Sequence, residues 1–143
     1  LSSNLKLACH RLSDHHIQPV FEMINSTDMP RFLVQNIAQA QEMLEAVQHP
    51  ALKMQYDCYH MAMMGEDVLE ALKENIHDIG HIQFADCPGR HEPDTAQIHF
   101  AEIFQWLNQS AYNGYIAAEY RPQAHSSHSF AWKDKYFAKH PQS

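Results

Sequence analysis

The 143-residue sequence has no apolar run of 18 residues, the approximate length that a membrane-spanning helix requires. It also has only four glycines, and none of them forms the glycine-rich fingerprint of a P-loop or of a dinucleotide-binding turn. A Gly-x-Ser-x-Gly nucleophile motif is missing as well. These absences exclude a helical membrane span, argue against phosphate cradling and give no support to α/β-hydrolase chemistry.

Cysteine and positive charge are both scarce. Cys9, Cys58 and Cys87 are widely spaced and form no Cys-x-x-Cys pair, so neither a zinc knuckle nor a disulfide framework is indicated. Reduced thiols of this kind favour a cytoplasmic location. With 10 Lys and Arg against 17 Asp and Glu, the formal charge is −7. This deficit argues against a nucleic-acid-binding surface, which needs clustered positive charge.

The sequence does contain enough apolar material, 45% of its residues, for the core of one globular domain spanning residues 1–143. Short apolar runs predict strands over residues 17–22, 52–57, 81–86 and 115–119. Apolar residues at helical spacing predict helices over 4–14, from a cap at Asp28 through Val47, around Val68 to Ile76, around Phe100 to Leu107, and over 129–137. Such alternation predicts βα units and a parallel sheet with right-handed crossovers.

Polar residues stand at or near the ends of all four predicted strands, namely Glu22, Asp57, Gln83 and Glu119. Since parallel strands end at the same edge of a sheet, three carboxylates and an amide should converge there. Crowded carboxylates repel one another, and a divalent cation relieves that repulsion. An all-oxygen ligand set suits Mg²⁺ or Mn²⁺. A single acid could be a helix cap or a solvated charge, but four such residues at one edge indicate a site.

Several motifs occur in a fixed order along nearly the whole chain: Phe-Glu-Met-Ile-Asn at 21–25 with Asp-Met-Pro at 28–30, Gln-Tyr-Asp-Cys-Tyr-His-Met at 55–61, Gly-His-Ile-Gln-Phe-Ala-Asp at 80–86, Pro-Gly-Arg-His-Glu-Pro at 88–93, Tyr-Asn-Gly-Tyr at 112–115 and Glu-Tyr-Arg-Pro at 119–122. Together they resemble the hydroxypyruvate isomerase family of the xylose-isomerase-like TIM barrels. The resemblance implies a (β/α)₈ barrel, which typically needs about 250 residues. The chain would then supply a leading helix and about four C-terminal βα units. Such a half barrel exposes sheet edges, so we expect self-association or pairing with an N-terminal half.

The same resemblance implies an isomerase that interconverts hydroxypyruvate and 2-hydroxy-3-oxopropanoate through an enediolate. It assigns proton transfer to Glu22 and Glu119, and substrate binding to His60 and Arg90, although either of these two residues could also be an ordinary loop residue. It assigns a divalent metal ion, Mg²⁺ or Mn²⁺ and not necessarily obligatory, to the four residues at the strand ends: Glu22, Asp57, Gln83 and Glu119. The expected partner is a small hydroxy or oxo acid, with neither nucleic acid nor membrane involved.

Three alternatives stay open at this point. A 2-oxo-tetronate isomerase would use the same scaffold for a substrate one carbon longer. An abasic-site endonuclease of the same superfold would need more histidine ligands and a basic groove, which the charge of −7 disfavours. A half-barrel fragment without catalytic activity would fold but not turn over substrate.

Overall fold

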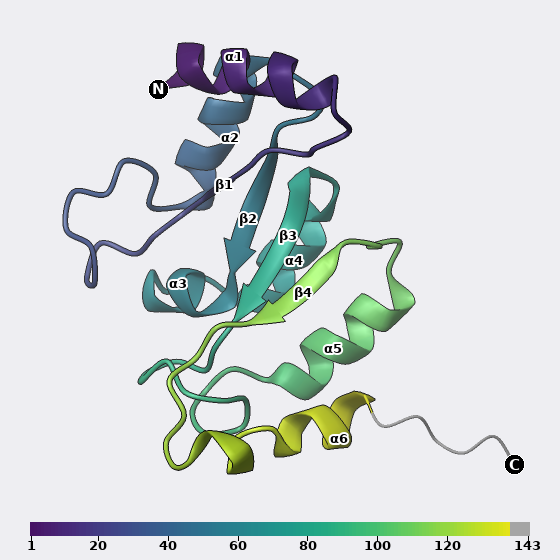
Figure 1. Ribbon diagram of the computed structural model, residues 1–143. Helices are drawn as coiled ribbons and strands as arrows, with labels where there is room; N and C mark the ends of the chain where they lie inside the picture. Colours follow the sequence, from purple (N-terminus) through teal and green to yellow (C-terminus); the bar gives the residue numbers. More distant parts are fainter. Residues whose placement is uncertain (138–143) are drawn as a thin grey trace, which may run out of the picture.

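A computed structural model describes residues 1–137. In chain order the elements are α1 (Ser2–Ser13), β1 (Val20–Glu22), α2 (Ile37–Val47), β2 (Lys53–Asp57), α3 (Cys58–Met63), α4 (Val68–Asn75), η1 (Ile76–Asp78), β3 (Ile79–Phe84), α5 (Phe100–Gln109), β4 (Tyr115–Ala118), η2 (Ser126–His128) and α6 (Ala131–Phe137). The four strands form one parallel sheet in the order β1-β2-β3-β4 (Figure 1). This arrangement confirms the predicted βα units and is that of a partial α/β barrel.

Two predictions about local structure are wrong. Asp28 does not cap α2, which instead begins after Asn36, whose side chain accepts a hydrogen bond from the backbone of Gln39. The physical reason is that Asn25 Oδ1 accepts the amide hydrogens of Thr27 and Asp28, which folds this segment into a turn. The segment after β2, predicted to be a loop, forms α3, because the Asp57 carboxylate caps its first turn.

The strand boundaries also shift from the predicted ranges. β1 begins at Val20 instead of residue 17, and β3 runs from Ile79 to Phe84 instead of from 81 to 86. Ile79 is buried and lies opposite Met54 of β2, so packing extends this strand at its start. β4 ends at Ala118, although the amide of Glu119 still donates to the Phe84 carbonyl at 3.0 Å.

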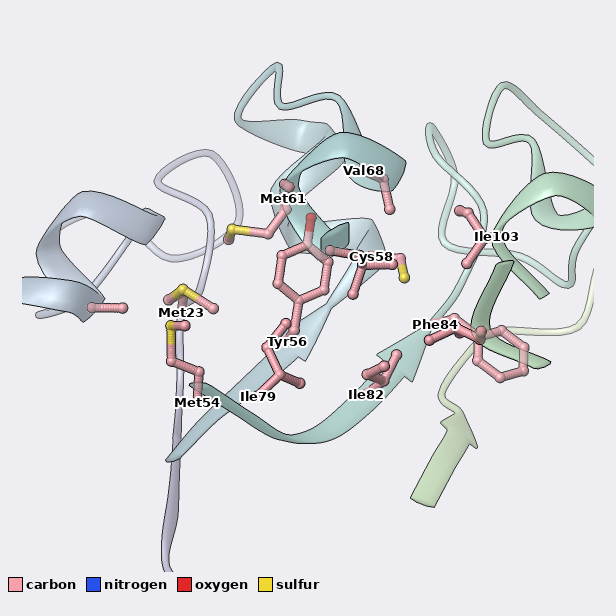
Figure 2. Close-up of a cluster of buried hydrophobic side chains, with 14 of the residues drawn as sticks. Met23, Met54, Tyr56, Cys58, Met61, Val68, Ile79, Ile82, Phe84 and Ile103 are labelled. Atoms are coloured by element: carbon pink, nitrogen blue, oxygen red, sulfur yellow. The ribbon is translucent and has the colours of Figure 1, made fainter. Parts of the chain in front are cut away.

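The hydrophobic core lies between the sheet and its covering helices. Buried sheet residues such as Met54, Tyr56 and Ile82 pack with Met61 of α3 and Val68 of α4 (Figure 2). A smaller cluster of Cys9, Val47 and Leu52 joins α1 and α2 to the start of β2. None of the helices within residues 1–137 combines the length and the apolar content needed to cross a bilayer.

The opposite face of the sheet carries the predicted site residues. Glu22 lies opposite Gln55, Asp57 opposite Gln83, and Gln83 opposite Ala117. Because side chains alternate between the two faces of a strand, the side chains of all these residues share one face. In residues 1–137 no helix covers this face (Figure 1). Tyr115, two residues before Ala117 in β4, shares this face and is 85% exposed. The site therefore begins on the uncovered face and continues to the carboxyl ends of the strands.

Candidate active site

A cleft of about 580 Å³ opens at the carboxyl ends of the strands. It is lined by Glu22 at the end of β1, Ile24, Asp28 and Met29 of the β1–α2 loop, Tyr59 and His60 of α3, Gly89 and Arg90 after β3, and Glu119 and Arg121 after β4. Four of the predicted site residues, Glu22, His60, Arg90 and Glu119, thus line one cleft. Asp57 lies beneath it, fully buried.

Asp57 combines a satisfied oxygen with an unsatisfied one. Its Oδ1 accepts the Tyr59 amide hydrogen at 2.8 Å, whereas its Oδ2 has no hydrogen-bond partner among residues 1–137. Arg90 Nη2 lies 3.5 Å from that oxygen. Burial is the main cause that raises the pKa of Asp57 from 3.8 to about 6. Such an oxygen is ready to accept a cation or a proton.

Glu22, at the end of β1, also has an unsatisfied carboxylate oxygen. Its Oε1 is buried, and within residues 1–137 it receives no hydrogen bond. Burial, followed by the negative charge of Asp57, raises the pKa of Glu22 from 4.5 to about 7. At neutral pH this carboxyl group is therefore partly protonated, which suits a residue that exchanges protons with a substrate.

Arg90 supplies a positive charge between the carboxylates. Its Nη2 atom donates to Glu119 Oε2 at 2.9 Å, and its guanidinium lies over the Tyr59 ring, 5.0 Å from the centroid. The backbone that presents it is unusual, since Gly89 and Arg90 have φ values of 104° and 57°. The guanidinium thus balances part of the negative charge at this edge of the sheet.

The loop that carries Arg90 is held by Asp86, a role the sequence analysis missed. The Asp86 carboxylate is fully buried and accepts four backbone hydrogens, from Cys87, Thr95, Ala96 and Ile98, at 2.8–3.0 Å. The backbone amide of Asp86 donates a hydrogen bond to the His91 carbonyl, and its carbonyl accepts one from the Arg90 amide. This clamp folds residues 87–98 back toward the sheet and fixes the base of Arg90.

A second network that the sequence analysis missed surrounds His60, which is only 3% exposed. The ring Nδ1 lies 2.7 Å from Asn25 Nδ2, and the same amide nitrogen donates to Asp28 Oδ2. Tyr59 also donates to Asp28 Oδ2, at 2.8 Å. Burial, followed by the charge of Arg90, lowers the pKa of His60 from 6.5 to about 4. The only signal in the sequence was an asparagine and an aspartate shortly after a predicted strand.

The four predicted metal ligands do not share one environment. Gln83 Oε1 accepts a hydrogen bond from Gln55 Nε2 at 2.6 Å, and Glu119 is paired with Arg90. A compact group of candidate ligand atoms comes from Glu22, Asp57 and His60, all within 4.8 Å of one another. Glu22 and Asp57 therefore belong both to the predicted set and to this compact group.

The raised pKa values predict how stability depends on pH. A carboxyl group that ionises at higher pH in the folded chain than in the unfolded chain destabilises the fold as pH rises between the two pKa values. The contribution of Glu22 to the free energy of unfolding should therefore fall from about pH 4.5 to pH 7. In urea denaturation, Glu22→Gln is expected to gain stability relative to the parent chain at pH 7.5 compared with pH 4.5. A difference between the two chains that does not change with pH would contradict the assigned burial cost.

Comparison with known proteins places this geometry in a family. The family model described as xylose isomerase-like TIM barrel matches residues 1–136. The chain is 35% identical to a 2-oxo-tetronate isomerase of Cupriavidus necator and 35% identical to the hydroxypyruvate isomerase of Escherichia coli, covering 95% of this chain and 52% and 53% of those proteins. A crystal structure of an AP endonuclease, family 2, from Brucella melitensis superposes with a TM-score of 0.90 and 27% identity, over 94% of this chain and 52% of that one.

The chain spans about half the length of the curated relatives it matches. The motifs, the parallel half-barrel sheet and the family match over residues 1–136 all agree. The chain belongs to the xylose isomerase-like TIM barrel family.

Proposed function

We propose that this protein is an isomerase that interconverts hydroxypyruvate and 2-hydroxy-3-oxopropanoate through an enediolate. The observation that carries the proposal is that two glutamates, Glu22 at the end of β1 and Glu119 just after β4, line one cleft together with Arg90, whose guanidinium pairs with Asp57 and Glu119. The identity of 35% to the E. coli hydroxypyruvate isomerase supports this choice of reaction.

The reaction requires two proton transfers at neighbouring carbons. One glutamate removes a proton from C3 of hydroxypyruvate, which gives the enediolate, and the other returns a proton to C2. The hydroxyl proton moves from O3 to O2, so that C3 becomes the aldehyde and C2 carries the hydroxyl group. Glu22 suits such an exchange because its pKa of about 7 lies near neutral pH. Arg90 can pair with the substrate carboxylate, because its planar fork presents two parallel hydrogen-bond donors.

The oxygen atoms at the strand ends also fit a divalent metal ion. Two buried oxygens without hydrogen-bond partners in residues 1–137, Glu22 Oε1 and Asp57 Oδ2, are the chemistry that Mg²⁺ or Mn²⁺ takes as ligands. We propose that these two residues hold the ion, with Gln83 and Glu119 completing the set. When bound, the ion would supply Lewis-acid stabilisation of the enediolate.

Metal binding predicts a measurable difference between two aspartate variants. Titration with Mn²⁺, followed by electron paramagnetic resonance, should show binding to the parent chain that Asp57→Asn weakens by more than about tenfold, since a charged ligand is lost. Asp14→Asn is the matched control, because Asp14 is exposed at the end of α1. Equal binding by the parent and Asp57→Asn would contradict the assignment.

A coupled assay of hydroxypyruvate consumption, with and without a chelator, tests the proposed reaction. We expect conversion to 2-hydroxy-3-oxopropanoate, and a lower rate after chelation that Mn²⁺ restores. If the protein forms a complete barrel with an N-terminal half and still shows no conversion, the proposal is overturned. Unchanged conversion after complete metal removal would overturn only the metal assignment.

A second candidate is the isomerisation of a 2-oxo-tetronate, which is one carbon longer. It is favoured by the 35% identity to the C. necator enzyme of that name. The same assay with this substrate decides between the two, because the preferred substrate is the one with the higher kcat/KM. The endonuclease name of the B. melitensis structure is not favoured here, because the charge is −7 and several carboxylates line the cleft.

We further propose that the uncovered face of the sheet packs against the N-terminal half of the same barrel. β1 and β4 are edge strands among the described elements, and Tyr115 is 85% exposed on that face. The matched region is about half of each relative, so the rest of a relative has the size of a second half barrel. Without that half, the 143-residue chain should self-associate, and Tyr115→Lys should reduce this association in sedimentation experiments. A monomeric parent chain at tens of micromolar would contradict the proposal.

A reducing compartment such as the cytoplasm fits the cysteines. Cys9, Cys58 and Cys87 are all free and buried. Their burial raises each thiol pKa, so these groups are poorly reactive as thiolates. We propose a structural role for them and a cytoplasmic location for the protein.

A further inference from the structure

We propose that Asn25 is a positioning residue that holds His60 as the tautomer with its proton on Nε2. His60 then acts as a hydrogen-bond donor toward the cleft and not as a metal ligand. The identity of the substrate oxygen that accepts this hydrogen bond rests on the proposed function, whereas the tautomer itself rests only on the contacts described next.

The orientation of the Asn25 amide is fixed by its oxygen. Oδ1 accepts backbone hydrogens from Thr27 at 3.0 Å and from Asp28 at 2.8 Å. A nitrogen in that position would face two donors, so the amide cannot be turned over. Asn25 is fully buried, and its other end, the NH₂ group, therefore points toward His60 and Asp28.

Both hydrogens of that NH₂ group have acceptors. One is donated to Asp28 Oδ2 at 3.0 Å, and the nitrogen also lies 2.7 Å from His60 Nδ1. Asp28 Oδ2 accepts from Tyr59 as well, and this contact and the Asn25 hydrogen bond are the two main causes that lower the Asp28 pKa. Since Asp28 is held as an acceptor, the remaining Asn25 hydrogen is directed at the histidine ring.

His60 Nδ1 must then carry a lone pair. It faces the Asn25 side-chain NH₂ at 2.7 Å and the Asn25 backbone amide at 3.4 Å, and both of these groups can only donate. A hydrogen on Nδ1, in the other neutral tautomer or in the doubly protonated ring, would meet two donors. The contacts therefore select the neutral ring with its hydrogen on Nε2.

This tautomer decides between two possible sets of metal ligands, one that includes His60 and one made of oxygen atoms only. The proximity of His60 to Glu22 and Asp57 would allow a histidine ligand, but a nitrogen that carries a hydrogen cannot coordinate a metal ion. Nε2 instead lies 3.9 Å from Asp57 Oδ2, and His60 lines the cleft. From that place it can donate to an oxygen of a bound hydroxy or oxo acid. A metal ion would then be left to the oxygen ligands.

The tautomer can be read directly by long-range ¹H–¹⁵N correlation spectroscopy of the imidazole rings. The chain has 12 histidines, so the His60 signals are assigned as those missing from His60→Gln. We expect a protonated Nε2 and an unprotonated Nδ1 in the parent chain near pH 7, without added metal. A protonated Nδ1 would overturn the proposal, whatever the protein catalyses.

A charge-conserving double variant, Asn25→Asp with Asp28→Asn, reverses the polarity of the network. Residue 25 then accepts from Nδ1, so the hydrogen should move to Nδ1 and leave a lone pair on Nε2. Titration with Co²⁺ alone, followed by visible absorption, should show at least about tenfold tighter binding to this variant, because a nitrogen ligand is gained.

Asp28→Asn alone is the matched control and should keep the Nε2 hydrogen, since Asn25 still donates to Nδ1. A double variant that retains the parent tautomer while remaining folded by circular dichroism would contradict the role of Asn25. In the active protein, the double variant should raise KM for the substrate more than it lowers kcat. Loss of the tautomer effect and loss of isomerase activity are thus separate outcomes, because the first is measured without substrate.

Discussion

Replacing Glu22 or Glu119 with glutamine is expected to lower kcat for hydroxypyruvate isomerisation by about 10³-fold or more. Glutamine keeps the size of the side chain but can neither remove a proton from carbon nor return one, and a positioned acid or base contributes about 10²–10⁴-fold. Both residues line the cleft, and the charge of Glu119 is one of the causes that raise the pKa of Glu22. Two groups so close together can act on adjacent carbons of one small substrate.

The fold should survive both substitutions. Glu22 Oε1 is buried and has no partner in residues 1–137, and Glu119 is 53% exposed, so neither side chain holds the core together. Glu45→Gln is the matched control, because Glu45 is exposed on α2 and does not line the cleft. The double variant should be little worse than either single variant, since residues that act as one unit lose activity non-additively. A double variant that still converts hydroxypyruvate would contradict the two-glutamate mechanism.

The convergence of Glu22, Asp57 and Glu119 was predictable because it depends on periodicity and topology. A parallel sheet places strand ends at one edge, and alternation places residues two apart on the same face. A boundary error of two residues, as in β3, therefore leaves Gln83 on the predicted face. The prediction depended on residues being an even number of positions apart, which puts them on one face, and not on where each strand begins or ends.

The contacts made by Arg90 and Asn25 were not predictable from the same patterns. Arg90 reaches Glu119 because its loop is folded back onto Asp86 and passes through left-handed backbone at residues 89 and 90. Asn25 meets His60 across 35 positions of sequence. Neither contact follows from periodicity, since each depends on how a loop closes. Asp28 shows the same limit, because its local sequence is typical of a helix cap while tertiary contacts use its carboxylate elsewhere.

Replacing Arg90 with methionine should lower kcat/KM for hydroxypyruvate by about 10²-fold or more, chiefly through KM. Losing one partner of a desolvated, hydrogen-bonded charge pair costs about 2–5 kcal/mol. The Arg90 side chain is 24% exposed and faces the cleft, so a substrate carboxylate would meet a partly desolvated guanidinium. Arg90→Lys should recover only part of the loss, because an ammonium group cannot form the paired hydrogen bonds of the planar fork.

Dihydroxyacetone separates a role in carboxylate binding from a general role in the site. It has the same α-hydroxy ketone as hydroxypyruvate but carries no carboxylate, and its isomerisation to glyceraldehyde needs the same two proton transfers. If Arg90 binds the carboxylate, Arg90→Met should abolish the preference of the parent protein for hydroxypyruvate while changing kcat/KM for dihydroxyacetone by less than about tenfold. An equal fall for both substrates would instead mean that Arg90 acts on Asp57 and Glu119, whose negative charges it balances at 3.5 Å and 2.9 Å.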